Sequence, residues 1–593
     1  RTSTNHTYTL PHGKTSSYTN QANQLTLSFE NQSGLSIDYI FRAYNDGIAY
    51  QYRIPDMNTP QIDVDDSSFN LPDSATLWAQ NLSSNYEGRY TKSTIAQLNT
   101  KQIGFPLLAQ VAPDVWTLLS EVNSNFASYT SSHLISYNSQ GIFLLRPAIS
   151  EPIPITIQLP FSSPWRVAVI GDLDTIIEST MAENLADEAT EPDTSWIKPG
   201  KVAWSWWSNP NSPTDLQTQK EYIDFASQMG WEYILIDEGW NQNWIPELID
   251  YANTKNVKVI LWYFFGGNFS GWTPNGWVPS YDVSLATFAK LKNWGVSGAK
   301  IDFFDSDTQK TNQIKQDILK AAQDSQQLVN FHGSSFPRGE RRSWPHLLTK
   351  EGVLGAEHKG QTAAHNINLT FTRNVLGPMD YTPVTFSNKG TTTNAHQLAQ
   401  AVIFESAWQH FADSKETYLT QPEPVVDLLK KVPTFWDETR FIQGEPDSHI
   451  VLARRKGQDW YIAAFSKDQM AFNFPLSDLN NTNSFQATYF VDGHTADDID
   501  TYSESLIPQT EIQFNTAAGG GAVIILTSTS QQPSCLTADI NVDGIVDLGD
   551  YSILSANFFA TSPSNEKVDI NQDGIVDLTD YSVLSSNFLQ QCH

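Results

Sequence analysis

Two acidic residues, Asp302 and Glu357, are the residues of this chain whose types and positions best suit catalysis. Asp302 lies in the stretch Lys300-Ile301-Asp302-Phe303-Phe304, which is typical of a strand end, and Glu357 follows in a segment that also contains Glu351. Two carboxylates that face one pocket are the minimal equipment for cleaving a glycosidic bond. We therefore predict a catalytic pair here, which the other elements must position.

The alternation of side chains along the predicted strand places Asp302 beside Lys300. Residues two apart on a strand point to the same side, so both face away from Ile301. An ordinary lysine–aspartate pair, buried for reasons of folding, is the alternative. Several polar or aromatic residues at the ends of other predicted strands, Trp204 among them, favour a functional rim. We predict the following substrate-binding residues: Asp237, Glu238, Trp240, Lys300 and His332.

The segment 194–435 alternates predicted strands with predicted helices. Strands are expected at 202–207, 233–237, 257–263, 299–304 and 328–331, and helices at 214–229, 245–255, 284–294 and 309–324. Repeated strand–helix units indicate a parallel sheet, and several units in a row favour a (β/α)₈ barrel, whose active site lies at the carboxyl ends of the strands.

The regions on either side of the barrel show strand patterns instead. Residues 1–193 contain alternating apolar and polar residues separated by Asn, Gly, Asp and Pro turns, which predicts a β-sandwich. The segment 436–527 is predicted to be an all-β domain. The polar stretch 528–534 is typical of a linker, and 535–593 is predicted to be a separate small module.

The last module contains two acidic loops with the same spacing. Each has oxygen-bearing side chains at positions 1, 3, 5, 9 and 12 and a glycine at position 6, the pattern of an EF-hand calcium loop. Two solvated acidic turns are the alternative, but they would not repeat the spacing. Helices are predicted to follow at 551–558 and 581–588. The predicted calcium ligands are Asp539, Asn541, Asp543, Asp547 and Asp550, and Asp569, Asn571, Asp573, Asp577 and Asp580.

These duplicated loops lack an entering helix, and in this the module resembles a dockerin. The resemblance implies a cohesin-bearing partner. Positions 10 and 11 of the loops carry Leu548-Gly549 and Leu578-Thr579, where hydroxyl residues often make the partner contact in cellulosomal dockerins.

Composition and charge limit the partners and the compartment. The 593-residue chain has a formal net charge of -29, which argues against nucleic acid, and no apolar run approaches the roughly 20 residues of a membrane span. Cys535 and Cys592 bracket the last module. A disulfide between them, with two unpaired thiols as the alternative, would indicate an oxidising compartment. The chain starts at Arg1, not Met, and we expect a processed, secreted protein, either extracellular or in the periplasm or at the cell surface.

The first three domains resemble glycoside hydrolase family 97. The motifs that carry the resemblance are Arg42-Ala43-Tyr44-Asn45-Asp46-Gly47, Ala203-Trp204-Ser205-Trp206-Trp207-Ser208, Ile236-Asp237-Glu238-Gly239-Trp240, Lys300-Ile301-Asp302-Phe303, Glu351-Gly352-Val353-Leu354-Gly355-Ala356-Glu357, Phe371–Pro383 and Trp436-Asp437-Glu438-Thr439. The resemblance implies the same succession of β-sandwich, (β/α)₈ barrel and C-terminal β domain.

The resemblance also offers a choice between two mechanisms. Inverting members carry a base glutamate directly after a histidine on the fifth strand, whereas here Gly333 follows His332. Asp302 matches the nucleophile of the retaining, α-galactosidase-like members, and Glu357 matches their acid/base. Lys300 could keep Asp302 charged. Retention predicts that the two carboxyl groups lie roughly 5–6 Å apart, and about 7–9 Å would favour inversion.

The family resemblance further implies one Ca²⁺ beside the active site. Glu351 and Glu357 match barrel ligands, and Glu121 matches a ligand from the N-terminal domain. Carboxylate oxygens suit this hard cation. Without the resemblance, Glu121 is better interpreted as a surface glutamate at a strand edge.

Three activities are compatible with these residues. The first is a secreted, retaining exo-α-galactosidase that acts on an oligosaccharide or polysaccharide. The second is an α-glucosidase or a β-L-arabinopyranosidase of the same family, because L-arabinopyranose matches galactose at C2, C3 and C4 and lacks only the C6 group. The third is an inactive sugar-binding subunit, which the presence of both Asp302 and Glu357 disfavours.

Overall fold

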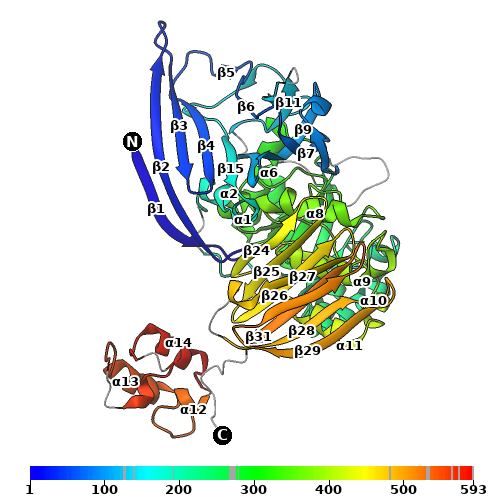
Figure 1. The fold of residues 1–593 in the computed structure, drawn as a ribbon. Coiled ribbons are helices and arrows are strands. Elements are labelled where there is room, and N and C mark those ends of the chain that lie inside the picture. Colours follow the sequence, from blue (N-terminus) through cyan, green and yellow to red (C-terminus); the bar gives the residue numbers. More distant parts are fainter. Residues whose placement is uncertain are drawn as a thin grey trace.

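The computed structural model describes residues 1–123, 128–137, 140–190, 193–265, 276–277, 280–479, 483–528, 535–561, 565–571 and 574–589. Three large domains follow one another along the chain, and a small helical module ends it (Figure 1). The predicted multidomain fold class is confirmed. None of the helices in this described part is both long and apolar enough to cross a membrane.

The N-terminal domain is built almost entirely from β structure. Its main sheet has 13 strands, and neighbouring strands run mostly antiparallel. Its longer strands are β1 (Thr2–Thr9), β2 (Ser17–Glu30), β3 (Ser36–Tyr44), β4 (Gly47–Ile54), β7 (Thr76–Asn81), β9 (Gln102–Ala112), β10 (Val115–Val122), β11 (Ser132–Tyr137), β12 (Ile142–Pro147) and β15 (Trp165–Gly171). Two short helices, α1 (Leu173–Glu178) and α2 (Met181–Leu185), lead towards the barrel.

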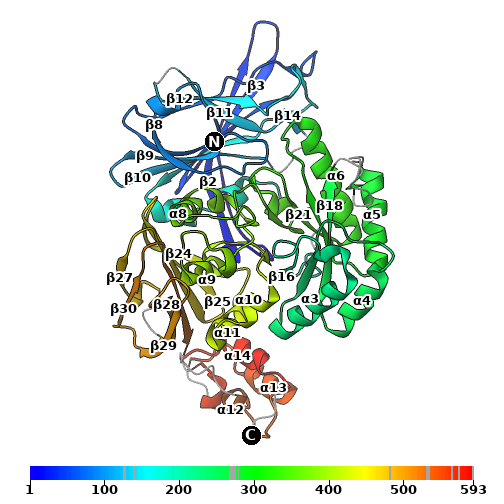
Figure 2. The same ribbon diagram turned by 90° about the vertical axis from the view of Figure 1, so that its right-hand side faces the viewer.

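The central domain is a parallel barrel wrapped by helices (Figure 2). Its strands are β16 (Gly200–Trp204), β17 (Tyr233–Ile236), β18 (Lys258–Phe265), β20 (Gly298–Asp302), β21 (Leu328–Phe331), β22 (Leu347–Lys350) and β23 (Trp408–Phe411), with the short β19 (Gly276–Trp277) beside β18. Its longer helices are α3 (Leu216–Met229), α4 (Ile245–Thr254), α5 (Tyr281–Trp294), α6 (Gln309–Ser325), α8 (Ala363–Phe371) and α9 (Asn394–Ile403). The alternation predicted from the sequence is therefore confirmed.

The barrel departs from the predicted eight regular strands between β22 and β23. These two strands end the parallel path, and no strand among the described residues pairs with both of them. An irregular segment takes that position: the Asp380 amide donates to the Lys350 carbonyl, and the Met379 amide donates to the Glu405 carbonyl, each over 2.9 Å. The barrel is thus nearly closed, and Asp380 is brought to its inner rim.

Side-chain caps explain where the barrel helices begin and end. Asp215, Ser280 and Thr308 each accept a hydrogen bond from an amide in the first turn of α3, α5 and α6, which satisfies donors that the helix leaves free. Gly230 and Gly295 end α3 and α5 in the left-handed conformation that glycine adopts without strain. The strands can therefore be presented in a fixed register.

The third domain is antiparallel. Its six-stranded sheet contains β24 (Glu438–Glu445), β25 (His449–Lys456), β26 (Asp459–Ser466), β31 (Gly521–Ser528), β28 (Phe485–Asp492) and β29 (Ile499–Leu506), and β27 (Met470–Pro475) pairs with β30 (Glu511–Thr516). The two sheets share one apolar core that includes Trp460, Phe472 and Phe514. Strands β26 and β31 of the six-stranded sheet pack on α9 of the barrel domain.

The last module has its own small core. Helices α12 (Cys535–Ala538), α13 (Leu548–Ala556) and α14 (Leu578–Ser586) surround buried aliphatic residues, among them Val546, Leu554, Val576 and Leu584. The two halves are equivalent: the Phe559 amide donates to the Val576 carbonyl, and the Leu589 amide donates to the Val546 carbonyl. Cys592, Asp573 and the side chain of Cys535 lie outside the described residues, so the predicted disulfide stays a prediction.

Candidate functional site

Asp302 is the last residue of β20, and two hydrogen bonds fix its carboxylate. The Trp262 indole nitrogen, from neighbouring β18, donates to Oδ2 over 3.1 Å, and the Phe303 amide donates to Oδ1 over 2.7 Å. Phe303 adopts a left-handed backbone conformation (φ 63°), which turns the chain sharply after the strand. Asp302 is 9% exposed, so its carboxylate is held in one orientation and remains reachable from one side.

Gly333 lies against Asp302 and leaves no room for a larger residue. Its φ is +51°, and an added Cβ would lie 2.6 Å from the Phe303 nitrogen and 3.1 Å from Asp302 Oδ1. Such a distance to backbone is shorter than real contacts allow, and a left-handed φ strains residues other than glycine. The position that carries a base in inverting relatives is therefore closed here by the Asp302 turn.

Lys300, two residues before Asp302, is paired with Asp237, which directly follows β17. Its ammonium nitrogen lies 3.3 Å from Asp237 Oδ2 and 4.7 Å from the centre of the Trp204 ring, and the Trp204 indole donates to the same oxygen over 2.8 Å. Burial alone would lower the pKa of Lys300, but Asp237, Glu357 and Asp302 together raise it, so Lys300 stays charged. The rim thus contains a fixed positive charge between carboxylates.

His332 lies close to three acidic side chains, those of Asp302, Glu351 and Asp380. Its Nδ1 lies 3.1 Å from Glu351 Oε2 and 3.7 Å from Asp302 Oδ2, and its Nε2 lies 3.2 Å from Asp380 Oδ2. Burial opposes protonation, but Glu351 and Asp302 raise the pKa of His332 to about 10. His332 thereby links the side chains of Glu351, Asp302 and Asp380, and its predicted contact with substrate stays a prediction.

Asp380 is a site residue that sequence reasoning did not assign, although it lies in the quoted segment Phe371–Pro383. Besides His332 it accepts from Asn330 Nδ2 over 2.6 Å and lies 3.1 Å from His410 Nδ1. Burial would raise its pKa, but His410 and His332 hold the pKa of Asp380 well below its usual range. It anchors the cluster from the irregular seventh position of the barrel.

Glu357 has an environment suited to holding a proton. One of its carboxylate oxygens, Oε2, is buried and has no hydrogen-bond partner among the described residues. Burial, together with the charges of Asp302 and Asp237, raises the pKa of Glu357 against the opposing effect of Lys300 and His332. Asp302 and Glu357 therefore share one site but differ in environment, one firmly hydrogen-bonded and the other poorly solvated.

Glu351 is the residue around which a cation would fit. Atoms of Asp302, His332 and Glu351 lie within 4.8 Å of one another. Burial raises the pKa of Glu351 well above its usual range, and repulsion from Glu87, Glu357 and Asp302 adds to this effect against the charge of His332. Such crowding of carboxylates suits a divalent cation that prefers oxygen ligands.

Glu87, which sequence reasoning also missed, comes to this site from the N-terminal domain. Its Oε2 lies 2.7 Å from Nε2 of His358, the residue directly after Glu357. The contact joins domains far apart in the sequence, so only the fold reveals it.

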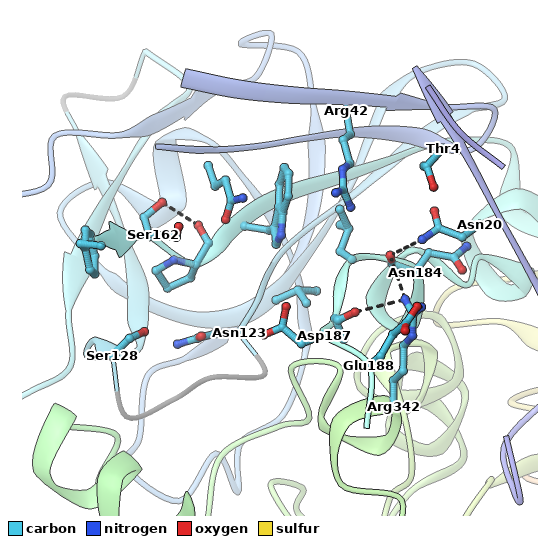
Figure 3. A pocket seen from close by; sticks show the side chains of 18 of the residues that line it. Thr4, Asn20, Arg42, Asn123, Ser128, Ser162, Asn184, Asp187, Glu188 and Arg342 are labelled. Carbon is cyan, nitrogen blue, oxygen red and sulfur yellow. Dashed lines mark hydrogen bonds and ion pairs between the residues drawn. The ribbon is translucent and has the colours of Figure 1, made fainter. Parts of the chain in front are cut away.

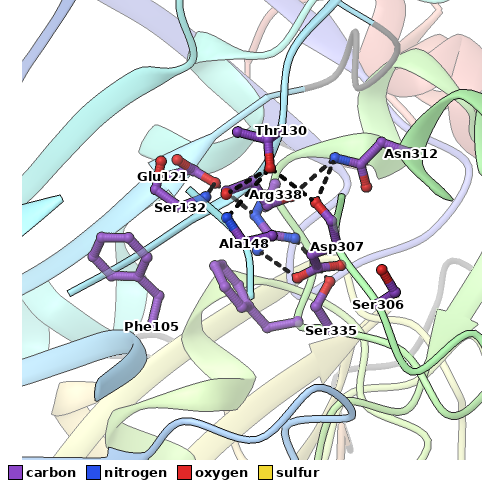
Figure 4. A network of polar contacts seen from close by, with 12 residues as sticks. Phe105, Glu121, Thr130, Ser132, Ala148, Ser306, Asp307, Asn312, Ser335 and Arg338 are labelled. Carbon is purple, nitrogen blue, oxygen red and sulfur yellow. Dashed lines mark hydrogen bonds and ion pairs between the residues drawn. The ribbon is translucent and has the colours of Figure 1, made fainter. Parts of the chain in front are cut away.

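Glu121 has a different role from the predicted calcium ligand. It is fully buried, and its Oε2 lies 2.6 Å from Arg166 Nη1, while its Oε1 accepts from Arg338 Nε and from the Ser132 amide (Figure 4). Both oxygens thus face guanidinium groups, which a cation would have to displace. We therefore correct the expectation and leave Glu121 out of the calcium site.

Two further predicted substrate-binding residues, Trp240 and Glu238, differ in their exposure to solvent. Trp240 is 3% exposed and its indole donates to the Trp262 carbonyl over 2.7 Å, so it supports Trp262, and its predicted contact with substrate stays a prediction. Glu238 is partly exposed, and burial together with Asp237 and Asp302 raises its pKa. It remains a rim residue that can contact a substrate.

The loops of the last module have the predicted turn geometry. Gly544 and Gly574 have φ of 91° and 92°, the left-handed conformation that a sharp turn between ligands requires. Asp550 is completely buried and accepts from the Asn541 and Asp547 amides, and Asp580 does the same in the second loop. The helices begin three residues earlier than predicted, because Asp547 and Asp577 cap them.

Calcium removal is expected to unfold this module and leave the three larger domains folded. Without a cation, the buried Asp550 and Asp580 carry uncompensated charge. In such small domains the free energy of metal binding contributes directly to the free energy of folding. Circular dichroism and limited proteolysis with and without EDTA measure this. The variant Asp550→Ala/Asp580→Ala should show no response to added calcium. A module equally resistant to protease with and without EDTA would contradict the expectation.

Family models match four segments of the chain. Residues 1–187 match the glycosyl-hydrolase 97 N-terminal model, 196–353 the glycoside hydrolase 97 model, and 435–527 the glycosyl-hydrolase 97 C-terminal, oligomerisation model. Residues 537–589 match the dockerin type I domain. The domain order predicted from the sequence corresponds to this succession.

Individual relatives agree with the family models. A probable retaining alpha-galactosidase of Streptomyces bingchenggensis is 33% identical over 453 residues, covering 73% of this chain and 69% of that protein. A retaining alpha-galactosidase of Bacteroides thetaiotaomicron is 28% identical over 86% of each chain. The crystal structure of a beta-arabinopyranosidase matches with a TM-score of 0.81 and 27% identity, over 88% of this chain and 90% of that one.

The barrel, its carboxylate cluster and these matches agree with one another. An acidic pair of the kind formed by Asp302 and Glu357 suits glycoside hydrolysis, and the acidic loops are those of a calcium-binding module. The chain therefore belongs to glycoside hydrolase family 97 and carries a C-terminal dockerin type I domain.

Proposed function

We propose that this glycoside hydrolase is a retaining exo-α-galactosidase. The observation that carries the proposal is the closed position at Gly333, where an added Cβ would meet the Asp302 turn. A base on the opposite side of the sugar has no place there, while Asp302 is oriented by two hydrogen bonds. Both relatives named as retaining alpha-galactosidases support this choice.

In the proposed reaction Asp302 and Glu357 act in two steps. Asp302 attacks the anomeric carbon while Glu357 gives its proton to the departing glycosidic oxygen, which forms a galactosyl ester of Asp302. Glu357 then takes a proton from water, the water oxygen attacks the anomeric carbon, and the Asp302 carboxylate leaves. Two inversions give net retention. His332 and Lys300 hold the surrounding charges, and Asp237, Glu238 and Lys300 are proposed to contact the sugar.

A calcium ion beside this pair is part of the proposal. Glu351 and Glu357 would hold it: possible ligand atoms of Glu351, Asp302 and His332 lie within 4.8 Å of one another, and carboxylate oxygens suit a hard divalent cation. When bound, it supplies positive charge that offsets the repulsion among these groups. With one ion in each dockerin loop, the chain would bind three.

The dockerin type I domain supports a place outside the cell, in an assembly with a cohesin-bearing protein. We propose secretion and attachment of this kind. An oligosaccharide or polysaccharide carrying terminal α-galactose would be the substrate.

Product stereochemistry and a substrate panel test the proposed activity. We expect proton NMR to show α-galactose as the first product of a nitrophenyl α-galactoside, before mutarotation. First formation of the β-anomer would refute retention. The structural match to a beta-arabinopyranosidase makes that activity the second candidate, so the panel includes a β-L-arabinopyranoside and an α-glucoside. Preference for the arabinoside would identify the second candidate, and hydrolysis of the α-glucoside alone would refute both.

Replacement of Glu357 by glutamine is expected to affect substrates according to their leaving groups. A substrate with a poor leaving group needs the proton of Glu357, so its kcat should fall by about 10²–10⁴-fold, the usual share of general acid catalysis. A nitrophenolate leaving group needs little protonation, so the rate of the first step with a nitrophenyl glycoside should fall less.

The pH profile provides the control for this variant. Burial raises the pKa of Glu357, whereas a bound calcium ion would lower it, and kcat/KM should fall as pH rises through the resulting value. The glutamine variant should lose this alkaline limb. An unchanged limb would mean that another group donates the proton.

A further inference from the structure

A second cleft lies in the N-terminal domain, and none of its lining residues belongs to the catalytic cluster. It has a volume of about 570 Å³, within the range of about 300–1,000 Å³ common for small-molecule sites. Four parts of the chain form it: strands β1 to β4, the end of β10 with Asn123 and Ser128, the segment from Gln158 to Trp165, and the stretch from Asn184 to Glu188 with Arg342 of the barrel domain. Figure 3 shows Arg42 pointing from its strand into the cleft, with Asn123 and Asp187 across from it.

Arg42 and Trp165 form the most ordered part of the wall. The guanidinium carbon of Arg42 lies 4.7 Å from the centre of the Trp165 ring, and its Nε donates to Gln24 Oε1 over 3.0 Å. Stacking and this hydrogen bond hold the guanidinium plane in place. Gln24 takes one of the five N–H groups of arginine and the Tyr44 hydroxyl is a second neighbour, so the remaining N–H groups can donate to a ligand.

Side-chain amides and hydroxyls supply the remaining polar groups of the cleft. Each amide offers both a donor and an acceptor, which is what neighbouring sugar hydroxyls require. The amides and serines that line the cleft are Asn20, Gln51, Asn123, Gln158, Asn184, Ser128, Ser162 and Ser163. Some are already engaged, since Asn184 accepts from Tyr8 and donates to Thr19 and Thr180. Gln51, on β4 beside Arg42, belongs to the half-buried part of the wall.

The charges of the cleft favour a neutral ligand. Arg342 is paired with Glu188 at 3.0 Å and also donates to backbone carbonyls, so its charge is compensated within the protein. Asp187 lies opposite Arg42, and the formal charges of the two arginines and two acids cancel. A phosphate or another anion with several charges would find no surplus of positive charge here. A neutral polyol finds donors, acceptors and the flank of an aromatic ring.

We propose that this cleft is a second binding site for a neutral sugar, of one or two units. It would hold a part of the substrate or the released product apart from the catalytic centre. Arg42 and Gln51 would be the principal hydrogen-bonding residues, and the Arg42–Trp165 stack the platform.

Equilibrium dialysis of the full chain tests this proposal. The probes are labelled galactose and labelled melibiose, an α-galactosyl disaccharide, the latter with Asp302→Asn protein that cannot hydrolyse it. We expect the double variant Arg42→Met/Gln51→Ala to bind one molecule per chain fewer than its parent at saturation. The exposed arginine of the same sheet provides the matched control, Arg53→Met, which should bind as the parent does. Loss with melibiose alone would identify the substrate chain as the ligand, and loss with both would include the product.

Two results would overturn the proposal. The first is equal binding by parent and double variant, whatever the number of molecules bound. The second is a site that takes labelled galacturonate but neither neutral sugar, which would make Arg42 an anion site.

Activity of the double variant in the wild-type background separates this inference from the proposed function. Its kcat/KM on a nitrophenyl α-galactoside should stay within about twofold of wild type, because the cleft contributes no group to the catalytic cluster. If the catalytic centre accepted a different sugar, the total bound would be lower in parent and variant alike. The difference of one molecule would remain.

Discussion

Replacement of Asp302 by glycine is expected to lower kcat by at least about 10⁴-fold, since removal of a nucleophile costs on this order or more. Glycine leaves a space beside Gly333 and below Trp262 that a small anion can enter. Added azide should therefore attack the anomeric carbon of an activated α-galactoside in place of the carboxylate. The product should be β-galactosyl azide, because one displacement inverts the configuration.

The neighbouring acid provides a matched control. Asp305 has a left-handed backbone conformation (φ 43°) and is exposed, so Asp305→Gly makes the same chemical change nearby without straining the chain. We expect Asp305→Gly to keep activity within about tenfold of wild type, with no response to azide. NMR of the products and the rates with and without azide measure both variants. Near-normal turnover by Asp302→Gly would show that Asp302 is not the nucleophile.

The local part of this site could be predicted from the sequence. Alternation along Lys300-Ile301-Asp302 placed both polar residues on one side of a strand, and β20 has that geometry. Helix positions in the barrel followed from the alternation of strand-like and helix-like stretches along the sequence. The paired calcium loops carried their spacing in the sequence, and Gly544 and Gly574 have the predicted turn.

Contacts between distant segments could not be predicted in this way. Asp380 reaches His332 only because an irregular segment replaces the seventh strand, and irregular backbone has no periodicity to detect. Glu87 reaches His358 across a domain boundary. The hydrogen bond from the Trp240 indole to the Trp262 carbonyl likewise joins segments that the sequence alone does not bring together.

The contacts of the charged residue Glu121 could not be predicted from the sequence either. A glutamate on a strand is expected to be exposed unless a partner is known, and the partners here are Arg166, from the same sheet, and Arg338, from the barrel domain. Its family match suggested a metal, but the structure gives it two guanidinium groups. The N-terminal domain is thereby joined to the barrel through buried charge.

That connection predicts a large loss of stability when Arg338 is replaced. Arg338 is 3% exposed; its Nε lies 3.0 Å from Glu121 Oε1, and its Nη2 lies 3.1 Å from Asp307 Oδ2. Methionine has a similar length but no charge, so Arg338→Met would leave carboxylates buried without their shared partner. Breaking a buried pair in this way costs about 3–5 kcal/mol. Urea unfolding followed by tryptophan fluorescence measures the loss.

An exposed pair on a barrel helix provides the comparison that isolates burial as the cause. Lys320 lies 3.2 Å from Asp324 at the surface of α6, and Lys320→Met should cost less than about 1 kcal/mol. Asp307 follows Asp302, the proposed nucleophile, by five residues and is held by Arg338 and Lys315, so loosening Arg338 should also free the segment between them. Arg338→Met is therefore expected to lower kcat more than it raises KM. A variant as stable as Lys320→Met would mean that the domains do not depend on this network.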